Sequence, residues 1–217
     1  NIKPDYIEYH DNLLFLQSIN DFDYNLYHKS AEDYVKTIQE KINSKFLKWS
    51  CVQNPQRLRV GFVSGDFKNH PVGYFLEGLL TQLKSSNLDL YAFPTIPLED
   101  ELTTRIKSNF YCWEPIWGKS DKQAADLIYN HNINILIDLS GHTNRNRLPV
   151  FAFKPAPVQV SWLGYWASCC LPEIDYLLGD PYVTPYNESH HFSEKIWQLP
   201  ESYLCFTEPN TPVNINS

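Results

Sequence analysis

A polar segment with several reactive side chains follows the first strongly apolar run of the chain. It reads GDFKNHP over residues 65–71. Pro71 has its φ already set for the first helical position, so we expect His70 to lie at a helix N-terminus. The helix dipole there disfavours the protonated ring, which leaves the imidazole as a proton acceptor, a neutral hydrogen-bond partner or simply a helix cap. We take Asp66 and His70 as the candidate catalytic residues, with Asn69 and Pro71 beside them.

A second polar segment follows the most apolar run, residues 133–139. Gly141 permits close approach of the backbone, and His142 and Thr143 supply hydrogen-bonding groups. Asp138, inside the apolar run, is placed to orient one of these groups. We therefore assign Gly141, His142 and Thr143 to a substrate or donor cleft.

Two arginines and an aromatic loop add to these candidates. Arg145 and Arg147 could bind a phosphate or a carboxylate, although a solvated polar loop is the more frequent arrangement. The loop GYWASCC over 164–170 could stack on a flat ligand ring or bury its own rings in the core. Gly164 and Tyr165 join the candidate cleft residues.

These candidates directly follow runs that have the length and composition of buried strands. Such runs are found at 58–64, 88–93, 111–117, 133–139, 158–163, 174–178 and 196–199. Apolar residues at helical spacing predict helices over 72–83 and 102–110, and Ser120 opens a third with a capping box. Pro115 is expected to confine its run to a sheet edge. The pattern predicts an α/β fold, with a mostly parallel sheet, helices on both faces and a ligand beyond the carboxyl ends of the strands.

The first 50 residues have a helical pattern instead. Tyr34, Ile38, Ile42 and Phe46 recur every four residues, which predicts one apolar stripe on a helix that Ser30 can cap. The apolar segment 13–16 is the expected packing partner. Residues 51–57 break the pattern and are expected to form a linker. We therefore divide the chain into a helical segment, 1–50, and a lobe, 58–206.

Composition excludes several classes of protein. The 217 residues include 18 Lys and Arg against 25 Asp and Glu, for a formal net charge of −7. Scattered cations in a net acidic chain do not form the basic surface that binds nucleic acid. The longest apolar runs are far shorter than the roughly 20 residues that cross a bilayer. We expect neither nucleic acid nor a membrane as a partner.

Cysteine spacing and missing motifs narrow the chemistry further. The five cysteines include no C-x-x-C pair and no ligand-like spacing to histidine, so we predict neither a disulfide framework nor a metal site. Free thiols are typical of the reducing cytosol, which indicates a cytoplasmic protein. The absence of G-x-G-x-x-G and of a P-loop disfavours a dinucleotide oxidoreductase and a P-loop NTPase.

The strand-end segments, taken in order, resemble the catalytic region of the O-GlcNAc transferase and SPINDLY-like family, whose bacterial members usually follow tetratricopeptide repeats. The matching stretches are LRVGFVSGDFKNHPVGYFLEGLL (58–80), INILIDLSGHTNRNRLPVFAFKPAPVQVSWLGY (133–165), LPEIDYLLGD (171–180) and SEKIWQLPESYLCF (193–206). The first 50 residues resemble the helices that join the repeats to the catalytic region.

The resemblance implies the N-terminal Rossmann-like lobe of a GT-B glycosyltransferase. His70 matches the family's active-site histidine, and 141–143 match its second strand-end loop. The main uridine and diphosphate contacts belong to a C-terminal lobe that this chain is expected to lack, so we expect the chain to be inactive alone and to self-associate through its exposed apolar surface. The implied reaction is inverting transfer of N-acetylglucosamine from UDP-GlcNAc to Ser or Thr of a protein or peptide acceptor, without a cofactor or required metal.

Two departures from the family pattern leave alternatives open. Residues 130–132 read NHN where some relatives carry an acidic residue, and 166–170 read WASCC where the family usually has two glycines. One alternative keeps the fold with another donor or acceptor, such as GDP-fucose or an asparagine that is glucosylated. The other is an inactive, repeat-linked scaffold that binds protein partners.

Overall fold

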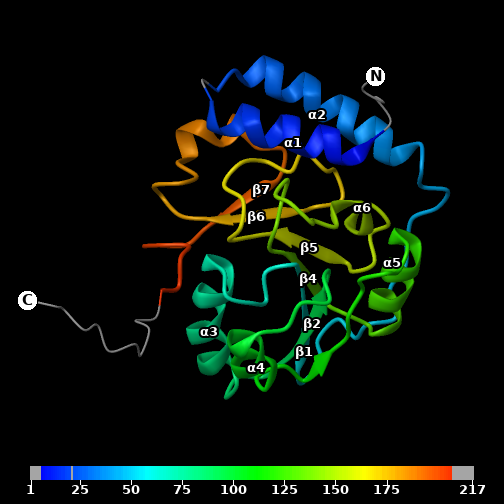
Figure 1. Cartoon of the computed structure of the whole chain (residues 1–217), viewed down its shortest axis with the longest axis vertical. Helices are drawn as coiled ribbons and strands as arrows, with labels where there is room; N and C mark the ends of the chain where they lie inside the picture. Colours follow the sequence, from blue (N-terminus) through cyan, green and yellow to red (C-terminus); the bar gives the residue numbers. More distant parts are fainter. Residues whose placement is uncertain (1–5, 21, 207–217) are drawn as a thin grey trace, which may run out of the picture.

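Seven parallel strands form a single sheet in the computed structural model, which describes residues 6–20 and 22–206 (Figure 1). The strands are β1 (Leu58–Ser64), β2 (Leu88–Pro94), β3 (Cys112–Trp113), β4 (Ile135–Asp138), β5 (Val158–Ser161), β6 (Tyr176–Gly179) and β7 (Lys195–Gln198). Their order is β3-β2-β1-β4-β5-β6-β7, with β3 at an edge as predicted. The order reverses between β1 and β4, where the crevice of such a sheet is expected.

Helices cover both faces of the sheet, as the strand pattern predicts. They are α3 (Pro71–Leu83), α4 (Glu101–Lys107), α5 (Asp121–Asn130), α6 (Leu148–Phe151) and the 3-10 helix η1 (Tyr186–His191). Figure 1 shows α3 and α4 on one side of the strands and α5 and α6 on the other. The α/β prediction is confirmed.

Side chains alternate along the strands between two cores. Phe62 of β1 packs with Leu76 and Leu80 of α3, whereas the next residue, Val63, belongs to the cluster that contains Ile128 of α5. Because successive side chains of a strand point to opposite faces, a strand buried on both sides needs an almost continuous apolar run. The uninterrupted apolar pattern of β1 therefore reflects its central place in the sheet.

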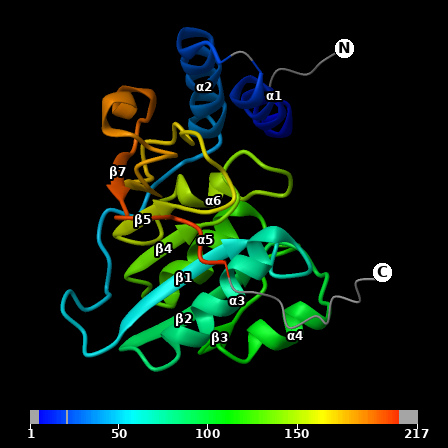
Figure 2. The same cartoon turned by 90° about the vertical axis from the view of Figure 1, so that its left-hand side faces the viewer.

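Two antiparallel helices, α1 (Ile7–Ile19) and α2 (Tyr24–Gln39), precede the sheet and lie together at one end of the molecule (Figure 2). The predicted cap at Ser30 is wrong. Asp23 caps α2 instead, accepting from the backbone N–H of Leu26 at 3.1 Å, and Ser30 lies inside the helix. The helix also ends before Phe46, which stacks on Tyr129 of α5 at 4.0 Å. Phe46, the last residue of the predicted apolar stripe, thus lies outside the helix and packs against α5 of the sheet domain.

The helical pair shares a core with the sheet. Tyr27 and Tyr34 of α2 are buried in the cluster that includes α5 and α6. The hydroxyl of Tyr27 lies 3.0 Å from that of Tyr165, and it donates to the Ser168 carbonyl at 2.6 Å. The pair therefore packs on the loops that follow β4 and β5. Among the described residues, no helix combines the length and apolar character that a membrane crossing requires.

Candidate functional site

His70 lies at the N-terminus of α3, directly after the turn that leaves β1. Its Nδ1 accepts a hydrogen bond from the backbone N–H of Val72 at 3.3 Å, and Pro71 occupies the first helical position. The predicted helix-terminal position of His70 is confirmed. The side chain remains 41% exposed, and its Nε2 has no hydrogen-bond partner in the described part of the chain. One nitrogen therefore serves the helix, and the other faces solvent.

The turn before His70, residues 65–69, is held by α4. Asp100, the N-cap of α4, accepts from the backbone N–H of Asn69 at 2.6 Å and from that of Thr103 at 2.9 Å. Burial raises the pKa of Asp100, but these N–H donors outweigh it and leave the pKa below its usual range. Thr103 also donates to the Phe67 carbonyl at 2.6 Å. The turn is thus positioned by rigid elements before any ligand binds.

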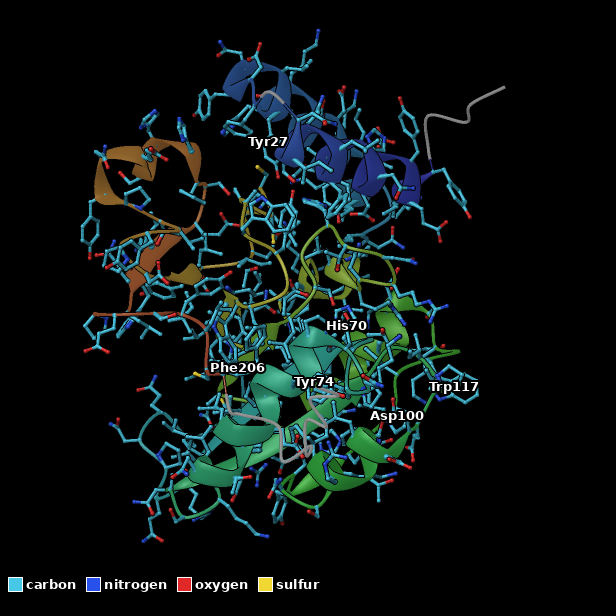
Figure 3. All side chains as sticks on the ribbon, turned by 60° about the vertical axis from the view of Figure 1, so that its left-hand side comes forward. Tyr27, His70, Tyr74, Asp100, Trp117 and Phe206 are labelled. Carbon is cyan, nitrogen blue, oxygen red and sulfur yellow. The ribbon has the colours of Figure 1, made fainter. Side chains whose placement is uncertain are left out.

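The other candidates of this turn surround the imidazole. Oδ2 of Asp66 lies 3.7 Å from Nδ1 of His70, and Oδ1 of the same carboxylate lies 3.8 Å from the ammonium of Lys68. The side-chain oxygen of Asn69 accepts from the Tyr74 hydroxyl at 3.0 Å. Figure 3 shows Tyr74 and Asp100 on the same side of the molecule as His70. The structure brings Asp66, Asn69, His70 and Pro71 together.

The cap hydrogen bond determines which proton the His70 ring can carry. A backbone N–H only donates, so Nδ1 accepts, and in the neutral ring Nε2 then carries the hydrogen. In this form Nε2–H is a donor toward solvent. For Nε2 to accept a proton, Nδ1 must hold the hydrogen and donate it to Asp66, which requires the present 3.7 Å separation to shorten. Asp66 is therefore the residue that can select between the two tautomers.

The loop after β4 is organised by a buried carboxylate. Asp138 accepts from the backbone N–H of Ser140 at 3.2 Å and of Gly141 at 2.7 Å. Gly141 has φ +52°, and a Cβ there would lie 2.3 Å from Cβ of Tyr165. The loop can pack against Tyr165 only because residue 141 is a glycine, which adopts this backbone conformation and has no side chain in the way.

His142, predicted as a cleft residue, is buried beneath α1. The side chain has no exposed surface; Nδ1 lies 2.7 Å from Oδ1 of Asp11 on α1, and Nε2 donates to the Cys169 carbonyl at 3.0 Å. Tyr34 meets the ring edge-on at 4.7 Å. Both ring nitrogens are therefore occupied by the protein, because the helical pair covers the loop that the sequence places at the open end of the sheet.

The aromatic loop after β5 is also packed inward. Tyr165 is 2% exposed, which favours the core interpretation of its ring over stacking on a ligand. The buried carboxylate of Glu194 accepts from Ser168 Oγ at 2.6 Å and from the Cys169 backbone N–H at 2.8 Å. Burial raises the pKa of Glu194. Cys170 adopts φ +53°, in the region that favours glycine, so the WASCC loop keeps a glycine-like bend without the glycine.

The two arginines after β4 have different environments. Arg147 donates to Asp121 at 2.9 Å and to the carbonyls of Ile116 and Lys119, each at 3.1 Å, so it stabilises the fold. Arg145 is exposed, and within the described residues its guanidinium has no hydrogen bond or ion pair. Its Cβ lies 3.6 Å from the position a Cβ would occupy at Gly65. Arg145 is therefore the loop cation that remains available to an anionic ligand near the β1 turn.

The candidates thus separate into two groups. Asp66, Asn69, His70 and Pro71 form the accessible group, whereas Gly141, His142 and Tyr165 lie beneath the helical pair. Thr143 donates to the Ser140 carbonyl at 2.7 Å, and a Cβ at Gly164 would lie 1.9 Å from the Leu139 carbonyl oxygen. The cleft roles of Thr143 and Gly164 stay predictions. A small pocket at the carboxyl ends of β1, β2 and β3 adds Trp113 and Trp117 beside Gly65.

Asp138 makes the stability of the protein depend on pH. Burial raises its pKa to about 6, against 3.8 for the free side chain, while the N–H donors of Gly141 and Ser140 oppose the shift. Between these values the folded state binds more protons than the unfolded state, so stability falls as pH rises from about 4 to about 6. The contribution is roughly 3 kcal/mol. Urea unfolding of the protein and of Asp138→Asn across this range should show that the variant loses this part of the decline. Identical pH profiles would contradict the assignment.

Comparison with known proteins identifies the family and the fold of this chain. Residues 21–208 match the family described as Glycosyl transferase family 41. A tomato (Solanum lycopersicum) protein described as "Probable UDP-N-acetylglucosamine--peptide N-acetylglucosaminyltransferase SPINDLY" is 31% identical over 200 residues, which are 90% of this chain and 21% of that protein. The Caenorhabditis elegans UDP-N-acetylglucosamine--peptide N-acetylglucosaminyltransferase is 32% identical over 158 residues, 70% of this chain and 14% of that protein.

A solved structure of a similar protein has the same fold. A mutant O-GlcNAc transferase from Thermobaculum terrenum superposes with a TM-score of 0.87 and 32% identity, covering 97% of this chain and 41% of that one. The chain spans about a fifth of the length of the first curated relatives. The sheet and helices of this chain therefore correspond to part of these longer relatives.

Proposed function

Because this chain belongs to glycosyl transferase family 41, we propose that the whole protein transfers N-acetylglucosamine from UDP-GlcNAc to Ser or Thr hydroxyls of proteins. The observation that carries the proposal is His70, which α3 and α4 hold with one free nitrogen at the carboxyl end of β1. The protein or peptide acceptor and the sugar nucleotide would meet against this turn. The chain supplies the Rossmann-like lobe.

The chemistry requires a path for the acceptor proton and stabilisation of the departing diphosphate. His70 serves the first need through Nε2 when Asp66 holds hydrogen on Nδ1. In the tautomer that the cap bond selects, Nε2–H instead donates to an oxygen of the donor or acceptor. The free guanidinium of Arg145 adds positive charge for the diphosphate. Inversion at the sugar follows from direct attack by the hydroxyl, with no residue in a covalent role.

The finer features of the proposal rest on separate observations. We place the protein in the cytoplasm, in keeping with five cysteines that are all free. The helical pair α1 and α2 would end a tetratricopeptide-repeat region. We propose that transfer needs no metal, because cationic side chains and helix N-termini meet the phosphate charge. Exposed Trp197 on the edge strand β7 and exposed Phe206 favour self-association of the isolated chain.

We also propose that the chain alone is inactive, since one lobe supplies one wall of the cleft. The most informative experiment tests a panel of sugar nucleotides with the full-length protein and a Ser- or Thr-containing peptide. Release of UDP together with glycosylated peptide is the expected result. Turnover of GDP-fucose would show that the proposed donor is wrong, and glucosylation of asparagine would show that both the proposed sugar and the proposed acceptor are wrong. Neither result would change the fold.

One observation favours a second function. The WASCC loop carries Cys170, with a positive φ, in a segment where the family usually has two glycines, so a side chain stands where a glycine would leave the backbone open to close approach. A scaffold that binds protein partners without catalysis would tolerate this change. Calorimetric titration of the full-length protein with UDP separates the two functions, because a scaffold would show neither binding nor transfer.

A further inference from the structure

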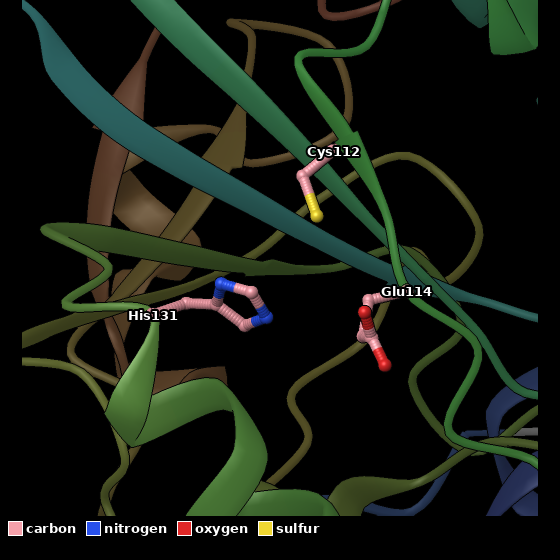
Figure 4. A group of neighbouring side chains, drawn as sticks. All are labelled: Cys112, Glu114 and His131. Carbon is pink, nitrogen blue, oxygen red and sulfur yellow. The ribbon is translucent and has the colours of Figure 1, made fainter.

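Three side chains with metal-ligating atoms converge beside the edge strand β3. Cys112, Glu114 and His131 each offer one such atom, and the three atoms lie within 4.8 Å of one another. Figure 4 shows the thiol, the carboxylate and the imidazole facing a common space. Within the described part of the chain, none of the three atoms has a hydrogen-bond partner. The three groups are therefore close together, and their ligating atoms are not hydrogen-bonded elsewhere in the described part of the chain.

The backbone explains why two of these side chains share a face. Cys112 and Glu114 are two residues apart on an extended segment, so they point to the same side. Trp113 between them points to the other side, where its ring centroid lies 5.3 Å from that of Phe67. The backbone N–H of Glu114 donates to the Ala92 carbonyl at 2.8 Å and continues the ladder past the end of β3.

His131 reaches the same space from the C-cap of α5. Its ring centroid lies 5.3 Å from that of Tyr91 and 5.8 Å from that of Phe93, and Arg59 donates to its carbonyl at 2.9 Å. The position of His131 is thus defined by the strands β1 and β2 as well as by its helix.

We propose that Cys112, Glu114 and His131 bind one Zn²⁺ ion, with solvent in the fourth position. Thiolate, imidazole and carboxylate are the protein ligands of zinc, and three of them with one open position form a recurrent tetrahedral site. Bond lengths of about 2.0–2.3 Å place neighbouring donor atoms about 3.5 Å apart in such a site. The observed separations, all within 4.8 Å, are to shorten toward this value when the ion binds.

Charge and access agree with a divalent cation. Zn²⁺ with one thiolate and one carboxylate has no net charge, so the nearby guanidinium of Arg59 does not oppose binding. Glu114 and His131 also line an open surface pocket with Asp126 and Asn130, which gives the ion and its water a route from solvent. The ion would join the two-residue strand β3 to the end of α5. This site shares no residue with the β1 turn and is independent of the proposed transfer.

The test is metal titration of the reduced, chelator-treated protein. We expect one equivalent of Zn²⁺ to bind and to raise the melting temperature. Co²⁺ in place of Zn²⁺ should give a thiolate-to-metal charge-transfer band, which reports sulfur ligation directly. Cys112→Ser should abolish this band and weaken Zn²⁺ binding by roughly tenfold or more, as expected for loss of a group that supports a metal site.

Matched variants make the result specific. Cys51 has the same intermediate burial as Cys112, so Cys51→Ser should keep both the band and the affinity. Glu114→Gln tests the site without altering a thiol, and it should weaken binding while circular dichroism stays unchanged. A His190→Ala and His191→Ala double variant should bind Zn²⁺ normally. A Co²⁺ complex without the band, or equal Zn²⁺ affinity in Cys112→Ser and the unmodified protein, would overturn the proposal.

Discussion

Replacing His70 by asparagine in the full-length enzyme is expected to lower kcat about 10²-fold or more while leaving the fold intact. Asparagine is a good N-cap, so the backbone N–H of Val72 keeps an acceptor. The substitution removes only the free ring nitrogen, whose proton transfer or donation is typically worth that factor. Initial rates of sugar transfer to a peptide, together with thermal unfolding, measure both effects. Near-normal turnover in His70→Asn would leave His70 with the capping role alone.

Two companion variants separate capping from chemistry and one tautomer from the other. His70→Ala should lose the same activity and also about 1 kcal/mol of stability, because α3 loses its cap. If Asp66 holds the hydrogen on Nδ1 of His70 so that Nε2 accepts the acceptor's proton, Asp66→Asn should lower kcat nearly as much as His70→Asn does. A small effect of Asp66→Asn would instead assign Nε2–H as a hydrogen-bond donor.

Replacing His142 by alanine is expected to lower the free energy of unfolding by about 3 kcal/mol or more. The substitution leaves the Asp11 carboxylate buried without its partner and removes the donor to the Cys169 carbonyl. Breaking a buried pair by removing one member costs about 3–5 kcal/mol. Urea unfolding followed by tryptophan fluorescence checks this value.

Controls identify the pair as the cause. His190 is exposed, so His190→Ala should change stability by no more than about 0.5 kcal/mol. The double variant Asp11→Ala and His142→Ala should lose less than the two single variants combined, because the second substitution removes the unpaired charge left by the first. Strict additivity would show that Asp11 and His142 do not interact energetically.

Local patterns of residues predict most of the helices and strands, and they predict the position of His70. The run from 58 to 64 forms β1, Pro71 begins α3 and Ser120 caps α5, because apolar periodicity, proline and capping chemistry act over a few residues. The same local rules place His70 at its helix N-terminus. The predicted start of α2 is wrong because the helix already begins at Tyr24, with Asp23 as its cap, and Ser30 donates to the Leu26 carbonyl inside the helix.

Contacts between distant segments are decided only by the tertiary structure. His142 directly follows a strand, where a cleft residue is expected. In the structure, however, α1 places Asp11, which is 131 residues away in the sequence, within hydrogen-bonding distance of the His142 ring. Asp100 fixes the His70 turn from the start of α4, and Glu194 fixes the WASCC loop from beyond β6. The capping box of Asp100 is a local pattern, but neither residue has a local pattern that indicates its distant partner. Such partners are set by which helix covers which loop.

The sequence by itself determined the parallel α/β sheet, the family resemblance and the helix-terminal histidine after β1, because each depends on residues that are neighbours along the chain. The tertiary structure alone decided which candidates are accessible and which are buried. It also joined Cys112 and Glu114 to His131, although their spacing carries no metal-ligand pattern. The physical reason is that strand order and helix packing, which arise from burial of the whole apolar surface, bring together residues whose chain separation contains no signal.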